Sequence, residues 1–215
     1  MSTPEIKTFV LGEYQTNCFV VSNPGCSEAW IVDCGFDPDE MLDWIEQRGL
    51  EPSAMLLTHT HPDHIAGVDR ALGRLGPMPI YVHEAEAGFC SDPMLNLSAV
   101  LGMPISVTEP DRLLHDGDTL HLAGEPWRVV HAPGHSPGGV LFIHDASGQA
   151  IVGDTLFAGS IGRIDFPSSD PEAFRRTILD VMMSLPDDLA LHPGHGPATT
   201  IGRERATNPF VVNGF

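Results

Sequence analysis

Residues 58–64 read THTHPDH and place four potential metal ligands, His59, His61, Asp63 and His64, within six positions. A short apolar run precedes this stretch and apolar residues recur at helical intervals beyond it, which predicts a strand-to-helix junction. His59 and His61 alternate, so they project to the same side of an extended segment. Asp63 and His64 are offset around the turn, and the stretch can therefore serve two adjacent metal ions. In the alternative interpretation the histidines are solvated or cap the next helix, and Asp63 is a helix N-cap.

Three later stretches each carry one more candidate ligand after an apolar, strand-like run. They are HAPGHS with His135, IVGDTLF with Asp154 and LHPGHG with His195. Taken singly each is weak, because a histidine after glycine and the pair Gly-Asp are common in turns. Loops at strand ends on one edge of a sandwich can, however, converge on one site. The sequence thus offers seven candidate ligands: His59, His61, Asp63, His64, His135, Asp154 and His195.

Periodicity and turn residues predict the helices and strands. Asp37, as N-cap before Pro38, predicts a helix that ends at Gly49, and Asp170 is the expected N-cap of a second helix. Strands in meanders, with helices between or outside them, favour an α+β sandwich in which helices cover two sheets, and we expect one domain over residues 1–215. We expect helices at residues 65–75 and 171–183, and strands at 6–11, 18–22, 29–33, 54–58, 80–83, 119–123, 127–131, 140–143, 150–152 and 189–191.

The charge balance limits the classes of partner. The chain has 11 Lys plus Arg against 29 Asp plus Glu, a net charge of −18, which disfavours binding to nucleic acid or to an anionic membrane. No apolar run approaches the ~20 residues that span a bilayer, and the N-terminus lacks a secretory or transit pattern, so we expect a cytoplasmic protein. The four cysteines form no Cys-x-x-Cys pair and are expected to be buried or incidental thiols.

Together, the four stretches resemble the metallo-β-lactamase superfamily from near residue 10 to the C-terminus. THTHPDH is similar to its HxHxDH motif, and PGH, GD and PGHG follow in the family's order at residues 133–135, 153–154 and 193–196. The resemblance implies a four-layer αβ/βα sandwich. It also implies that Asp33, in IVDCG, supports a histidine ligand, the alternative being an ordinary turn carboxylate. Finally, it implies one metal ion on His59, His61 and His135, a second on Asp63, His64 and His195, and Asp154 bridging both.

Imidazole and carboxylate ligands without cysteine suit Zn, Fe or Mn, and we expect two divalent ions, most simply zinc. Two such ions would acidify a bridging water, supply hydroxide at neutral pH and polarise a substrate carbonyl, so hydrolysis is the expected reaction. We assign Asp63 a double role, as a ligand and as the group that orients the hydroxide or accepts its proton. A metal-binding module without catalysis is the alternative of a different class.

Within the superfamily, GDTLFAGSIGRIDFP and HPGHGPATTIGRERATNPFV resemble the small glyoxalase II-like hydrolases, the hydroxyacylglutathione hydrolases. This resemblance implies a small-molecule thioester substrate, S-D-lactoylglutathione, cleaved to lactate and glutathione. Arg163 is a candidate for binding a substrate carboxylate, or for a salt bridge to Asp165. GRIDF also resembles the persulfide dioxygenases, which use one iron and O₂, and lactone or other ester hydrolases remain alternatives. We expect residues 88–104 to border the pocket, and the oligomeric state stays open.

Overall fold

The computed structural model describes residues 3–214 and contains two six-stranded sheets. The first sheet begins as an antiparallel meander and continues with parallel strands, because α1 (Asp39–Arg48) and then α2 (Pro62–Ile65) and α3 (Val68–Leu75) cross over between its strands. Its strand order is β1 (Glu5–Leu11), β2 (Thr16–Ser22), β3 (Glu28–Val32), β4 (Glu51–Leu56), β5 (Ile80–His83) and β6 (Arg112–Leu114). A long connection, which starts with the 3₁₀ turn Glu84–Glu86, joins β5 to β6.

The second sheet is mostly antiparallel, and one parallel pair, β10 with β13, requires a crossover. That crossover holds the hairpin β11 (Leu156–Phe157) and β12 (Ser160–Ile161), then α4 (Pro171–Arg176) with a π turn at Thr177–Val181 and a 3₁₀ turn at Met182–Ser184. The chain then closes with α5 (Ile201–Thr207) and α6 (Pro209–Val212). The strand order is β14 (Thr199–Thr200), β13 (Ala190–Pro193), β10 (Gln149–Gly153), β9 (Val140–His144), β8 (Glu125–His131) and β7 (Thr119–Leu122).

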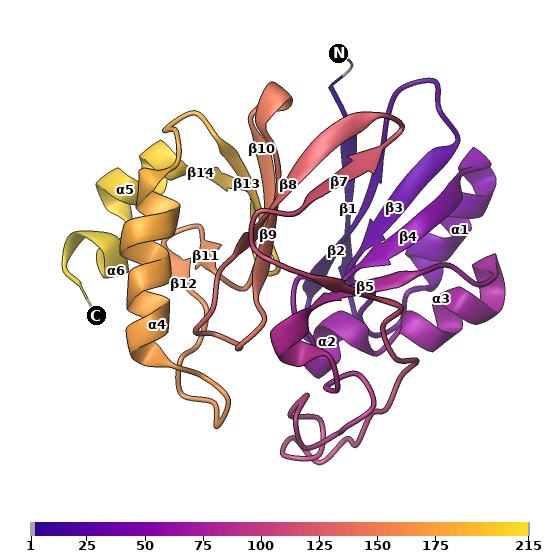
Figure 1. Ribbon diagram of the computed structural model, residues 1–215, viewed down its shortest axis with the longest axis horizontal. Helices are drawn as coiled ribbons and strands as arrows, with labels where there is room; N and C mark the ends of the chain where they lie inside the picture. The colour runs from indigo at the N-terminus through magenta and orange to yellow at the C-terminus, as the bar shows by residue number, and fades with distance from the viewer. Residues whose placement is uncertain (1–2, 215) are drawn as a thin grey trace.

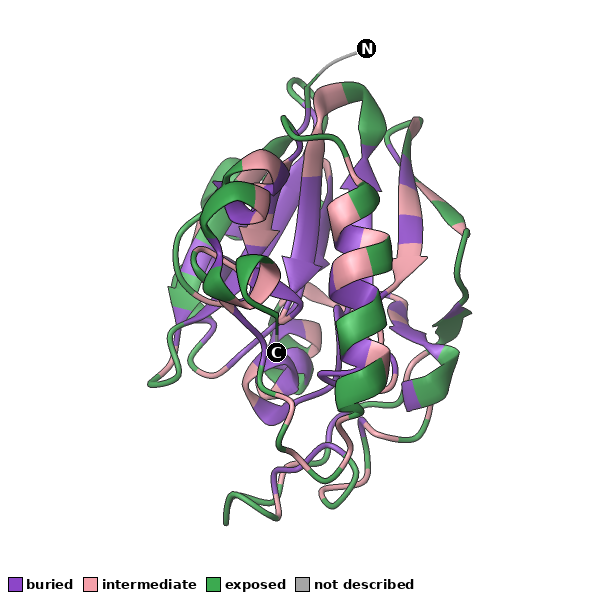
Figure 2. Cartoon of the chain, turned by 90° about the vertical axis from the view of Figure 1, so that its left-hand side faces the viewer, coloured by how far each residue is buried: buried purple, intermediate pink, exposed green. Residues whose placement is uncertain are grey.

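The two sheets pack face to face, with helices on both outer faces (Figure 1). One core lies between the sheets, where Trp30 and Trp127 meet edge to face with ring centroids 5.9 Å apart. Separate apolar clusters lie under α1 and α3 on one side and under α4 and α5 on the other. Figure 2 shows the same pattern, since the strands are mainly buried and the helices expose their outer faces. The predicted α+β, four-layer αβ/βα sandwich is therefore confirmed.

Two helix boundaries differ from the prediction. The prediction of Asp37 as N-cap was wrong: α1 starts at Asp39 after Pro38, no side chain caps it, and Asp37 takes a left-handed φ of 54°. The predicted helix over 65–75 breaks after α2 at Gly67. There the chain passes so close to β3's end that a Cβ on Gly67 would lie 2.4 Å from the Gly35 carbonyl oxygen. At the same place the Gly67 N–H donates to the Cys34 carbonyl at 2.8 Å instead of continuing the helix, so pairing with a distant segment ends α2, and local sequence does not reveal such pairing.

The C-terminal region matches the prediction in part. Asp170 is the N-cap of α4, since its carboxylate accepts a hydrogen bond from Ala173 N at 2.9 Å. The expected strand over 189–191 is β13, displaced to Ala190–Pro193, whereas α5 and α6 were not predicted. Among the described residues, no helix is long and apolar enough to cross a membrane.

Candidate metal centre

All seven candidate ligands gather where strands of both sheets end. The stretch 59–64 follows β4, whereas His135, Asp154 and His195 follow β8, β10 and β13 respectively. Their nitrogen and oxygen atoms form overlapping groups in which the potential ligand atoms lie within 4.8 Å of one another. We call His59, His61 and His135 the three-histidine group, and Asp63, His64 and His195 the mixed group; a third group, His59, His64 and Asp154, overlaps both.

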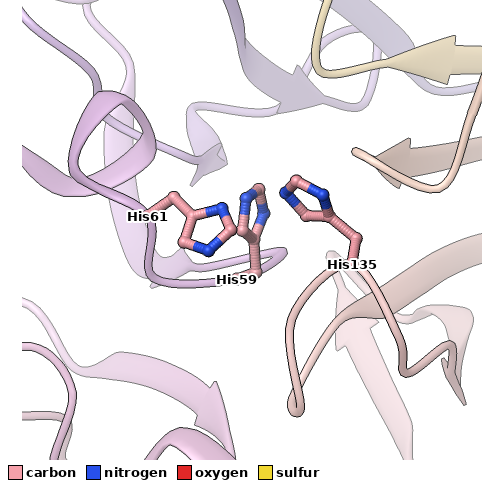
Figure 3. A group of neighbouring side chains, drawn as sticks. All are labelled: His59, His61 and His135. Atoms are coloured by element: carbon pink, nitrogen blue, oxygen red, sulfur yellow. The ribbon is translucent and has the colours of Figure 1, made fainter. Parts of the chain in front are cut away.

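In the three-histidine group the rings point toward one another (Figure 3). His59 and His61 come from one loop and His135 from another, with ring centroids 4.6–4.9 Å apart. His135 Nδ1 lies 2.8 Å from the Arg163 carbonyl oxygen, which can only accept, so Nδ1 carries the proton and Nε2 has a free lone pair. The Nε2 atoms of all three rings are buried, and no described residue gives them a hydrogen-bond partner.

In the mixed group the ring nitrogens face carboxylates. His64 Nδ1 lies 2.8 Å from Asp33 Oδ2, which turns its buried Nε2 toward Asp63 and Asp154. His195 Nε2 lies 3.2 Å from Asp63 Oδ2, and Thr16 donates its hydroxyl to that same oxygen at 2.8 Å.

Asp154 lies between the two groups. Its Oδ1 is 3.5 Å from His64 Nε2, and its Oδ2 is 3.5 Å from His135 Nε2 and 3.4 Å from His195 Nε2. Asp154 therefore lies within reach of both groups, and its bridging of two ions stays a prediction. The unpartnered buried nitrogens and the Asp154 Oδ1 would be costly without a cation, so this donor set fits two divalent ions.

The charges of the two groups differ. Burial, together with the neighbouring His135, lowers the pKa of His61 to about 3, and burial with His64 and His61 holds the pKa of His59 well below its usual range. These imidazoles are therefore neutral, as metal ligands must be. Burial would raise the pKa of Asp63, but His64 and His195 lower it to about 2.

In the metal-free chain, protons occupy the mixed group. Burial opposes protonation of His64, yet Asp63, Asp154 and Asp33 raise the pKa of that ring well above its usual range. Likewise, burial lowers the pKa of His195, but hydrogen bonds to Asp154 and Asp63 outweigh it and raise the value to about 9. A cation bound here would displace these protons.

The roles of two threonines near the site were missed in the sequence, because their partners lie far away along the chain. Thr58 donates both its N–H and its hydroxyl to the Asp33 carboxylate, each at 2.7 Å, and so links the end of β3 to the start of the histidine-rich loop. Thr16 holds Asp63 from β2, as described above. Each contact joins segments 25 or more residues apart in the sequence.

A cavity of about 240 Å³ opens beside the cluster. Arg163 lines it but is exposed: its Nε and Nη2 donate to Asp165 at 2.8 and 2.9 Å, and its guanidinium lies 4.5 Å from the centre of the Phe166 ring. The salt bridge to Asp165 is therefore present, whereas the binding of a substrate carboxylate by Arg163 stays a prediction. The expected border at residues 88–104 is present through Leu97 and Leu101. The other apolar lining residues include Tyr14, Pro62, Phe157 and Phe166.

Comparisons with known proteins agree with this geometry. The family model of the metallo-beta-lactamase superfamily matches residues 11–195. The chain is 33% identical over 207 residues to the probable metallo-hydrolase YqgX of Bacillus subtilis, with 95% of this chain and 96% of that protein covered. It is 34% identical over 200 residues to the hydroxyacylglutathione hydrolase GloC of Haemophilus influenzae, covering 92% and 93% of the two chains.

A solved structure is similar over the whole fold. The crystal structure of the BLEG-1 B3 metallo-beta-lactamase superposes with a TM-score of 0.91 at 38% identity, covering 97% of this chain and 100% of that one. The family match includes strands of both sheets and every candidate ligand, from His59 to His195. The chain is therefore a member of the metallo-β-lactamase superfamily, with a histidine and aspartate cluster compatible with a dinuclear metal site.

Proposed function

We propose that this chain is a metal-dependent hydrolase that cleaves a glutathione-type thioester, S-D-lactoylglutathione, to D-lactate and glutathione. The observation that carries the proposal is the pair of ligand groups joined by Asp154 at the base of the cavity. In this proposal His59, His61 and His135 hold one divalent ion, and Asp63, His64 and His195 hold the other. Zinc is the first choice, and iron and manganese suit the same ligands.

Divalent ions bound in these groups would lower the pKa of a bound water to near neutrality and polarise a substrate carbonyl. The protein itself must position the attacking water and accept its proton. Asp63 lines the cavity, and its low pKa leaves it ionised at neutral pH. Thr16 fixes one of its oxygens through a hydrogen bond of 2.8 Å. We assign Asp63 the role of orienting the attacking water and accepting its proton.

The substrate class is supported by the likeness to GloC, whose name states the hydrolysis of hydroxyacylglutathione. The cavity walls are largely apolar, which suits the body of a thioester, and Arg163 offers a positive charge at the wall. Asp165 occupies the Nε and Nη2 edge of that guanidinium. A substrate carboxylate could therefore bind this edge of Arg163 only by displacing Asp165.

A second candidate reaction is hydrolysis of a β-lactam amide. It is favoured by the 38% identity and the TM-score of 0.91 to the BLEG-1 B3 metallo-beta-lactamase. In both reactions water attacks a carbonyl carbon, but a thioester releases a thiolate whereas a β-lactam nitrogen must receive a proton as its bond breaks. The two candidates also differ in what the cavity walls accept.

The test is hydrolysis of S-D-lactoylglutathione by purified protein loaded with Zn²⁺ or Mn²⁺, in the absence of O₂. Release of glutathione, with Asp63→Asn as the inactive comparison, is the expected result. A β-lactam such as nitrocefin and a lactone are assayed in parallel. If the thioester is not cleaved, the thioester proposal is withdrawn, and oxygen uptake with glutathione persulfide then decides whether the chain is a dioxygenase.

A further inference from the structure

Glu86 is a fully buried carboxylate at the end of the 3₁₀ turn Glu84–Glu86. Its Oε2 accepts hydrogen bonds from the Thr60 N–H at 2.8 Å and from the Thr60 hydroxyl at 2.7 Å. Its Oε1 accepts the Gly138 N–H at 2.8 Å. Both oxygens thus accept from main-chain N–H groups, and Glu86 is not among the residues that line the cavity.

The two segments that Glu86 joins carry the whole three-histidine group. Thr60 lies between His59 and His61, and Gly138 lies three residues after His135. The carboxylate therefore spans the gap between the loop after β4 and the loop after β8, one oxygen to each. The spacing between these two loops determines whether His135 Nε2 meets the other two nitrogens.

Gly138 shows how close this contact is. A Cβ at this position would lie 2.8 Å from the Glu86 Cγ, although the Gly138 φ lies outside the left-handed region. Space, not backbone conformation, therefore excludes a side chain at this position. The absence of a side chain at Gly138 leaves the space that Glu86 occupies when it contacts the second loop.

A buried carboxylate is costly unless its hydrogen bonds are made, and a glutamine of the same shape could fill the same space. Glutamine, however, offers one oxygen and one NH₂, so it can accept from only one of the two loops. At the other loop the glutamine NH₂ would face a main-chain N–H, and two donors cannot form a hydrogen bond with each other. Only a carboxylate accepts from both loops at once.

We propose that Glu86 is a positioning residue for the three-histidine group: it sets the distance between the His59–His61 loop and the His135 loop so that three Nε2 atoms converge on one ion. The inference rests on the proposed metal centre, and it is independent of the substrate. It adds a residue outside all seven candidate ligands and outside the cavity wall.

The chain offers a matched control in Glu204, another fully buried carboxylate. Glu204 accepts hydrogen bonds from the Gly159 N–H at 2.7 Å, from Asn208 Nδ2 at 2.9 Å and from the Thr199 hydroxyl. These contacts tie the β11–β12 hairpin to the C-terminal helices and involve no candidate ligand. Glu204→Gln therefore costs stability in the same way but leaves both ligand loops in place.

The test compares Glu86→Gln and Glu204→Gln in the full chain, with Co²⁺ as the metal probe. Stoichiometry and affinity are measured by competition with a chromophoric chelator, and the ligand geometry by the visible absorption of the Co²⁺ protein. We expect Glu86→Gln to lower the affinity for one of the two Co²⁺ ions about 10–100-fold, the usual effect of losing a residue that orients ligands. The visible spectrum of the Co²⁺ protein should change as well. Glu204→Gln should stay within about twofold of the wild type.

Gly138→Ala provides a second, independent variant if Glu86→Gln does not fold. The added methyl group would contact the Glu86 side chain from the His135 loop and should lower the affinity for the same ion. The proposal is overturned if the folded variants bind two Co²⁺ ions with wild-type affinity and spectrum. It is also overturned if Glu204→Gln lowers the Co²⁺ affinity as much as Glu86→Gln does. Because the readout is metal binding, this result is separate from success or failure with S-D-lactoylglutathione.

Discussion

His64 Nδ1 and Asp33 Oδ2 lie 2.8 Å apart, and neither side chain is exposed to solvent. Since a carboxylate can only accept, the ring nitrogen donates, and the opposite nitrogen of His64 faces the mixed group, where a bound cation would replace its proton. Asp33 also accepts two hydrogen bonds from Thr58, so one carboxylate fixes both a candidate ligand and the start of the loop that carries it.

Replacing Asp33 by Asn should weaken metal binding at the mixed group about 10–100-fold. Asparagine tolerates the left-handed φ of 59° at this position, so the backbone is kept. It must, however, point an NH₂ group at either Thr58 or His64, both of which donate. The measurement is a metal titration, with the exposed Asp165→Asn as control, and unchanged affinity in Asp33→Asn would contradict the role of this contact.

Asp63→Asn should lower turnover of the cleaved substrate about 10²–10⁴-fold, because the amide cannot accept a proton from the attacking water. Metal content is determined in the same samples. Thr16→Val, which removes only the 2.8 Å hydrogen bond to Asp63, should give a much smaller loss. Full turnover by Asp63→Asn with both ions retained would remove Asp63 from the proton-accepting role.

The sequence predicted the fold and the clustering of candidate ligands because both depend on local patterns. Strand-like runs that end in His59, His135, Asp154 and His195 marked the strand ends, and these ends do meet at one edge of the sandwich. The prediction failed where distant segments decide the structure. The Gly67 N–H pairs with the Cys34 carbonyl, far earlier in the sequence, and this pairing interrupts the helix between α2 and α3.

The supporting residues around the site could not be predicted for the same reason. Thr16 and Glu86 reach partners 47 and 26 or more residues away, and neither lies in a repeated or spaced motif. The C-terminal helix α5 was missed because its stretch is short and mostly charged or small. Its N-cap is Thr200, whose hydroxyl accepts from the Arg203 N–H.

Gly194→Ala should disrupt the centre, although Gly194 is not a candidate ligand. A Cβ here would lie 2.2 Å from Asp154 Oδ1 and 2.9 Å from His64 Cε1. One of these side chains must move, so we expect metal affinity to fall at least tenfold, as when a group that orients ligands is lost. The control is Gly73→Ala in α3, where an added Cβ would meet nothing within 4 Å. This substitution should leave metal affinity unchanged and raise helix stability slightly.

Metal binding should release protons from the mixed group. The pKa of His195 is raised to about 9 and that of His64 lies well above its usual range, so both rings carry an extra proton at pH 7.5 in the chelator-treated protein. Ligands must be deprotonated, so loading both ions should release about two protons per chain from these two rings, and ionisation of a metal-bound water adds to that number. Calorimetric titration in buffers of different ionisation enthalpy measures this number, and a value near zero would contradict the assigned charge states.

Acid should destabilise the protein through His83, which lies outside the metal centre. His83 is 4% exposed, and its ring stacks on that of His131 with centroids 3.9 Å apart. Burial and His131 lower its pKa to about 4, against the opposing charges of Glu84 and Asp116 and with a further contribution from His115. The unfolded chain, with a histidine pKa near 6.5, therefore binds this proton more readily than the folded chain does.

It follows that the contribution of neutral, buried His83 to the free energy of unfolding is complete above about pH 6.5 and is lost as the pH is lowered toward 4. We expect a loss of about 1–3 kcal/mol in the free energy of unfolding across this window from His83. Urea unfolding of the chelator-treated protein at several pH values should show a smaller decrease for His83→Asn than for the wild type. The exposed His121→Asn serves as control, and parallel pH curves for wild type and His83→Asn would show that His83 does not titrate in this way.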